Sequence, residues 1–198
     1  MIAASTTLRD ARHRYFADNG FGPSGGYDDA WVDFKLGPVP FPFPNTAPRV
    51  RAVRLHDLHH ILTGYATDLC GELEISAWEL GAGCAGMLAA WQLNLGGLAL
   101  GLFLVPRRTF RAFVRGRRCR TLYRETYDEA LLARSVAETR RATGLDPAPA
   151  TTATLTDAAL FALAGAGGLV FGTALFLAIL PLALVAIGPL HLLRKRAR

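Results

Sequence analysis

Amphipathic stretches alternate with two long apolar stretches along this chain, and the alternation predicts a mostly α-helical fold. Apolar side chains recur at helical spacing through residues 49–63 and again through residues 68–80. Residues 87–105 form a strongly apolar helix in this pattern, and residues 106–144 are charged but largely helical. A further short helix is expected at residues 5–18.

Glycine and proline dominate the segment between residues 19 and 48, so we expect an irregular arm there. Its string PVPFPFPN cannot be helical, because alternate prolines remove N–H donors and hold the chain extended. The chain therefore divides into four parts. These are an N-terminal helix and arm (1–48), a helical core domain (49–145), a linker (146–157) and an apolar C-terminal segment with a basic end (158–198).

The C-terminal segment predicts attachment to a membrane. It has no charged side chain between Ala158 and Leu190 and ends in RKRAR, and this run exceeds the roughly 20 residues that cross a bilayer. Pro181 and Pro189 divide the run, so a single tilted span and a hairpin are both open. A hairpin keeps the basic end on the same cytoplasmic side as the seven arginines of residues 107–120, and we favour it for that reason.

The composition limits the kinds of molecule that the protein is expected to bind. The formal net charge is +6, and nearly all of the cationic residues are arginines. The arginine-rich stretch carries no signature of a nucleic-acid-binding fold, and beside apolar segments it favours contact with anionic lipid headgroups. Three scattered cysteines (Cys70, Cys84 and Cys119) argue against a disulfide framework and fit a reducing cytosol.

One stretch, LHDLHHILTGYATDLCGE, carries the candidate chemistry. His56 and His60 are four positions apart, so a helix places both imidazoles on one face, with Asp57 beside them. Asp68 can cap a second helix, which would bring Glu72 to the same place across a short turn. Two imidazoles and two carboxylates suit zinc, or ferrous iron in a two-histidine, one-carboxylate arrangement.

Other interpretations of the same residues are open. Two histidines at this spacing are often no more than the polar face of a helix. The triplet His56, His59 and His60 also matches one histidine box of the membrane di-iron hydroxylases, but these enzymes need about eight histidines, and here the others are His13 and His191. A phosphohydrolase of the His-Asp type needs further metal ligands, which this sequence does not offer in suitable places.

The whole pattern resembles the metal motif of the ubiquinone-biosynthesis family known as coenzyme Q protein four. The shared features are His-Asp-x-x-His at residues 56–60, Leu-Thr-Gly at 62–64 and Gly-Glu at 71–72. Trp78 and Glu79 lie where the family carries an aromatic residue and a glutamate, and residues 122–145 resemble its late helix. The final fifty residues and the proline-rich entry depart from the family.

The resemblance implies a divalent metal, usually zinc, with His56, Asp57, His60 and Glu72 as ligands. It implies a carbon–carbon lyase that removes the C1 carboxylate of a polyprenylated 4-hydroxybenzoate, a protein that organises other ubiquinone-biosynthesis enzymes, or both. A catalytic acid would protonate the ring carbon, and His59, Glu79 and Glu74 are candidates that the sequence does not rank.

The non-catalytic alternative is a metal-stabilised, lipid-binding scaffold of the same pathway. In either case we expect an active domain on the cytoplasmic face of a bacterial inner membrane, in contact with membrane lipid and a polyprenylated quinone precursor. We expect no nucleic acid as a partner, and a homodimer is possible.

Overall fold

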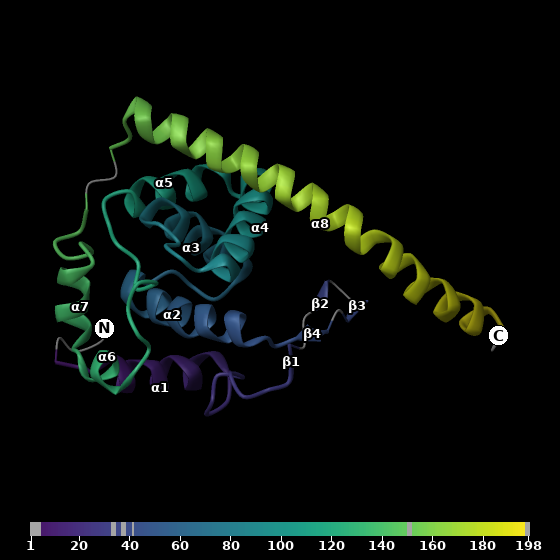
Figure 1. The fold of residues 1–198 in the computed structure, drawn as a ribbon, viewed down its shortest axis with the longest axis horizontal. Helices are drawn as coiled ribbons and strands as arrows, with labels where there is room; N and C mark the ends of the chain where they lie inside the picture. The colour runs from purple at the N-terminus through teal and green to yellow at the C-terminus, as the bar shows by residue number, and fades with distance from the viewer. Residues whose placement is uncertain (1–4, 33–34, 37–38, 41, 150–151, 197–198) are drawn as a thin grey trace.

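A computed structural model describes residues 5–32, 35–36, 39–40, 42–149 and 152–196, and within them the fold is mostly α-helical, as predicted. Figure 1 shows a helical core crossed on one side by a long C-terminal helix. The eight helices of the described residues are α1 (Leu8–Asn19), α2 (Ala47–Thr63), α3 (Leu69–Ala82), α4 (Leu88–Leu104), α5 (Pro106–Gly116), α6 (Glu129–Ala133), α7 (Val136–Ala142) and α8 (Leu155–Arg196).

The helix α3 lies at the centre of the core and packs against α4 and α5 (Figure 1). Two glycines bring the backbones of α3 and α5 into direct contact. A Cβ on Gly81 would lie 2.3 Å from the carbonyl oxygen of Phe113, and a Cβ on Gly116 would lie 2.1 Å from that of Trp78. No larger residue fits at either position without moving a helix, so α3 is held closely in place.

The two helices of the histidine motif form where the sequence predicts them, although α2 begins two residues earlier than expected and α3 ends two residues later. The Asp68 side chain accepts the Gly71 N–H at 2.7 Å and caps α3. Helix α2 ends at Gly64, whose φ of 78° is in the left-handed region that glycine adopts at low cost. The turn between the helices is short, so the end of α2 lies close to the start of α3.

The arm contains two short antiparallel strand pairs, where the sequence predicted irregular structure. β1 (Trp31–Val32) pairs with β4 (Phe43–Pro44), and β2 (Lys35–Leu36) pairs with β3 (Val39–Pro40). Pro40 and Pro44 lie within these short strands, where a missing N–H donor costs few ladder hydrogen bonds.

The region 106–144 is less helical than predicted. Helices α5, α6 and α7 account for part of it, and residues 117–128 run between them without helical structure. Tyr123 from this connection enters the core, which explains why the segment is ordered without being helical.

The predicted C-terminal hairpin is wrong. Residues 155–196 form one continuous helix, α8, which passes Pro181 and Pro189 without a turn (Figure 1). A proline inside a helix removes one hydrogen bond and can kink it, but chain reversal needs several residues in turn conformations. The structure thus has one C-terminal helix long and apolar enough to span a membrane.

Candidate metal centre

Three of the predicted ligands form a compact group. His56 and His60 come from α2 and Glu72 comes from α3, and their ligand atoms lie within 4.8 Å of one another. The two Nε2 atoms are 3.1 Å apart. The Glu72 carboxylate oxygens lie 3.4 Å from Nε2 of His56 and 3.3 Å from Nε2 of His60.

The other nitrogen of each imidazole is already engaged. Nδ1–H of His56 donates to Glu79 at 2.9 Å, and Nδ1–H of His60 donates to the carbonyl oxygen of Tyr65 at 3.0 Å. Each Nε2 therefore presents a lone pair to the other and to Glu72. Several acceptors that converge on one point need a proton or a cation between them. Partners of this kind on the far nitrogen are what orient metal-binding histidines.

The spacing of these atoms fits a metal ion. Ligand atoms about 2.0–2.1 Å from a central ion in a tetrahedral site are roughly 3.3 Å from one another. The three measured separations are 3.1, 3.3 and 3.4 Å. The group can therefore hold a divalent ion with little movement, although its donor set does not select between zinc and iron.

The electrostatics of the group favour a bound positive charge. Burial alone would raise the pKa of Glu72, but its hydrogen bonds and charge interactions with His56 and His60 lower it to about 2. Burial alone would lower the pKa of His56, but the charge of Glu79 and the hydrogen bonds of both glutamates raise it well above its ordinary value. In the absence of a metal, a proton on His56 fills the place that a cation would take.

The fourth predicted ligand, Asp57, is differently engaged. It is buried, and its two carboxylate oxygens accept the hydroxyl protons of Tyr27 at 2.6 Å and Tyr15 at 3.5 Å. The ring of Tyr15 in turn stacks on His60. The structure therefore groups three of the four residues and leaves Asp57 beside them, so its role as a ligand stays a prediction.

The two predicted catalytic residues lie behind the metal group, in the core. Glu79 is fully buried, and its carboxylate accepts four hydrogen bonds. The donors are Nδ1 of His56, Nδ1 of His59, Nδ2 of Asn94 and the hydroxyl of Tyr123, at distances of 2.9, 2.6, 2.6 and 2.6 Å. Burial alone would raise its pKa, but His56 and His59 lower that pKa well below its ordinary value, so Glu79 is an ionised acceptor.

His59 is enclosed in the same way. Nδ1–H donates to Glu79, and Nε2 accepts the backbone N–H of Leu122 at 2.8 Å. Burial lowers the pKa of His59, which keeps the ring neutral. The catalytic role of His59 and Glu79 stays a prediction, and this geometry favours a role in orienting His56.

One side of the metal group faces solvent. The Glu72 side chain is 42% exposed and that of His56 is 19% exposed, whereas that of His60 is 1% exposed. A structural metal site is usually enclosed by four protein ligands, while a catalytic site keeps a position open. The group has three ligand atoms and one accessible side, so an ion held there would keep a position open.

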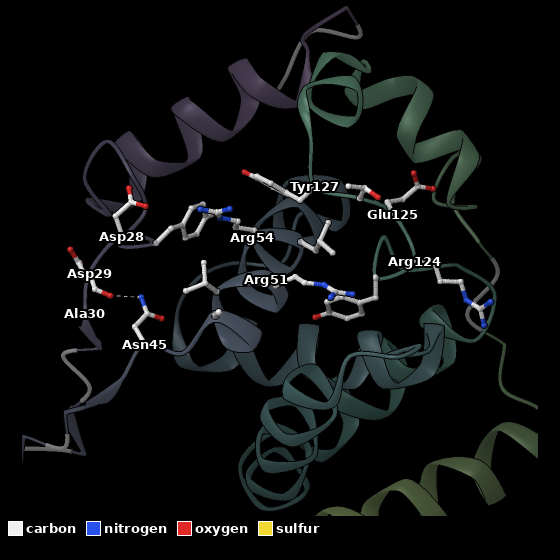
Figure 2. Close-up of a pocket in the computed structure, with 15 residues that line it drawn as sticks. Asp28, Asp29, Ala30, Asn45, Arg51, Arg54, Arg124, Glu125 and Tyr127 are labelled. Atoms are coloured by element: carbon white, nitrogen blue, oxygen red, sulfur yellow. Dashed lines mark hydrogen bonds between the residues drawn. The ribbon is translucent and has the colours of Figure 1, made fainter.

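A separate hollow of about 910 Å³ lies on the other side of α2. Figure 2 shows Arg51 and Arg54 within it, and these positions are on the helix face opposite His56 and His60. The guanidinium of Arg54 lies between the rings of Tyr27 and Tyr127, 5.2 and 5.5 Å from their centroids. The charged residues of its lining balance in number: Arg51, Arg54 and Arg124 against Asp28, Asp29 and Glu125. This balance selects no sign of ligand charge.

Sequence reasoning missed Asn94 and Tyr123, which complete the hydrogen bonding of Glu79. Asn94 had a detectable signal, since an amide within an otherwise apolar helix needs a buried partner. Tyr123 had none, because it reaches Glu79 from a connection without regular structure. In comparisons with known proteins, no family, no curated protein and no solved structure matches this chain.

Proposed function

We propose that the protein is a membrane-attached, metal-dependent lyase of ubiquinone biosynthesis, which removes the C1 carboxylate of a polyprenylated 4-hydroxybenzoate. The resemblance of the His-Asp-x-x-His and Gly-Glu pattern to coenzyme Q protein four suggests this reaction. The observation that supports it most is the convergence of His56, His60 and Glu72 with one side accessible.

The accessible side favours catalysis over a purely structural metal. A bound divalent ion would act as a Lewis acid that offsets negative charge on the substrate. His56 and His60 would hold the ion through Nε2, and Glu72 would hold it through its carboxylate. Glu79 and the Tyr65 carbonyl would keep the two imidazoles in the required tautomer.

The membrane helix suits a substrate with a polyprenyl tail. Such a tail partitions into the bilayer, so an enzyme that acts on the ring gains from being held at the membrane surface. Helix α8 is long and apolar enough to provide that attachment.

The test combines metal analysis with an assay on the same samples. Wild-type protein and His60→Ala are analysed for zinc and iron, and then assayed for release of carbon dioxide from a short-tailed prenyl 4-hydroxybenzoate. We expect about one metal ion per wild-type chain and loss of both metal and activity in His60→Ala. His13→Ala is the matched control, because His13 is exposed on α1 and outside the metal group.

The other outcomes distinguish the lyase, the scaffold and a protein without metal. A wild type that holds metal but releases no carbon dioxide contradicts the lyase and favours the metal-stabilised scaffold. A wild type without metal contradicts both, and the motif is then a polar helix face.

A further inference from the structure

Helix α8 has two parts with different surroundings. Between residues 155 and 172, the buried and half-buried positions recur every three or four residues along one face. These positions are 157, 160, 161, 164, 165, 168, 171 and 172. From Thr173 to Ala178 every side chain is exposed, so the helix leaves the core at about residue 173. Figure 1 shows the rest of α8 extending beyond the core.

The first part of α8 is firmly docked on α4. A Cβ on Gly168 would lie 2.8 Å from the carbonyl oxygen of Leu95, and one on Gly165 would lie 3.1 Å from the Leu102 side chain. Small residues that let two helix backbones approach this closely are typical of tightly packed helix pairs. Phe161 adds edge contacts with Phe110 and Phe113 of α5.

The start of α8 is also fixed by charge. The Asp157 carboxylate accepts the Thr154 N–H at 3.0 Å and a hydrogen bond from Arg118 at 2.9 Å. The docked part is therefore an element of the core and does not act as a flexible tether.

The length of the second part of α8 matches the thickness of the hydrocarbon core of a bilayer. From Thr173 to Leu193 the sequence has no Asp, Glu, Lys or Arg, and Arg194 and Lys195 follow. These residues number about 21, and at 1.5 Å per residue they span roughly 32 Å, close to the 30 Å of a hydrocarbon core. The whole apolar run from residue 158 is much longer than a bilayer requires, and the docked part accounts for the excess.

The α4–α8 contacts show where the two helices cross. Gly165 meets the Leu102 side chain, Gly168 meets Leu95 and Ala99, and Gly172 meets Ala99. Within the side chains that the structure describes, the contact with α4 is therefore confined to the part of α8 before residue 173.

We propose that residues 173–193 span a lipid bilayer, while residues 155–172 stay outside it as an element of the core. This inference uses no residue of the metal group, so it does not depend on the proposed function.

A pair of charge substitutions tests which part of α8 crosses the membrane. The variant Leu182→Lys/Leu184→Lys places two charges near the centre of residues 173–193, where each costs about 3 kcal/mol to insert. The matched control, Leu163→Lys/Leu169→Lys, places two charges on exposed positions of the docked part. We expect alkaline carbonate to extract the first variant and to leave the control in the membrane with the wild type.

The reverse result, or equal release of both variants, overturns the assignment of the span. Thermal unfolding of both variants in detergent separates loss of insertion from loss of the fold, since neither pair replaces a buried core residue that the structure describes.

Discussion

The two carboxylates that flank His56 have the same chemistry in opposite surroundings. Glu79 meets Nδ1 on the inner side, where it is fully buried and accepts four hydrogen bonds. Glu72 meets Nε2 on the outer side, where its side chain is 42% exposed. A buried carboxylate with every acceptor position used holds its neighbours in place, while an exposed one with free lone pairs can bind an incoming ion. The inner side therefore supports the structure, and the outer side carries the group that could hold a metal ion.

The largest expected loss of stability follows from a substitution on the inner side, at Glu79. Glu79→Ala leaves the donors of His56, His59, Asn94 and Tyr123 buried without an acceptor, and we expect a loss of about 3–5 kcal/mol in the free energy of unfolding. Urea unfolding in the presence of a chelator measures it. The shape-matched control Glu79→Gln keeps part of the hydrogen bonding and should lose less. Equal stability of wild type and Glu79→Ala would show that the inner side does not support the fold.

The second largest change in stability is expected when metal is removed from the outer side. A ligand that binds only the folded state at 100 times its dissociation constant adds about 2.7 kcal/mol to the free energy of unfolding. We expect zinc to raise the melting temperature of the chelated wild type. The variants Glu72→Gln and His60→Ala should lose this increase, because each removes a member of the group. An equal increase in both variants would place the binding elsewhere.

A smaller effect should appear in the pH dependence of the metal-free protein. The pKa of Glu72 is about 2 in the folded state and lies below its ordinary value of 4.5. Its contribution to stability is therefore complete above about pH 4.5 and is lost as the pH falls towards 2. Because this side chain is partly exposed, solvent screening limits the contribution to about 1 kcal/mol. Unfolding curves of wild type and Glu72→Gln should differ above pH 4.5 and converge towards pH 2; a constant difference would contradict the shift.

The smallest expected loss of stability distinguishes the two tyrosines beside Asp57. Tyr27→Phe removes a hydrogen bond of 2.6 Å to this buried carboxylate and should cost about 1 kcal/mol. Tyr15→Phe removes a contact of 3.5 Å and should cost less, so it serves as the matched control. If metal also binds more tightly in Tyr27→Phe, Asp57 competes for the ion and its predicted role as a ligand gains support.

The sequence was sufficient for the outer side of the site and for most of the helices. The spacing of His56 and His60 needs only one helix, and the Asp68 cap fixes where the next helix begins. Glu72 follows from that start, so local rules placed all three residues.

The inner side could not be predicted in the same way. Glu79 is two turns after Glu72 on α3, but which nitrogen of His56 it meets depends on how α3 crosses α2. The position of α3 in the core also depends on its backbone contacts with α5 at Gly81 and Gly116, which are thirty-five residues apart in sequence. The hairpin was wrong for a related reason, since a rule on loop charge says nothing of a helix docked on the core.

The reciprocal contact of Gly81 and Gly116 has a mechanical consequence. Helices α3 and α5 touch through their backbones, so no layer of side chains lies between them at that point to absorb a displacement. The two helices must move as one piece, and Glu72 and Glu79 travel with them. Glu79 also ties His56 and His59 of α2 to this rigid pair, so the three helices hold the geometry of the group together.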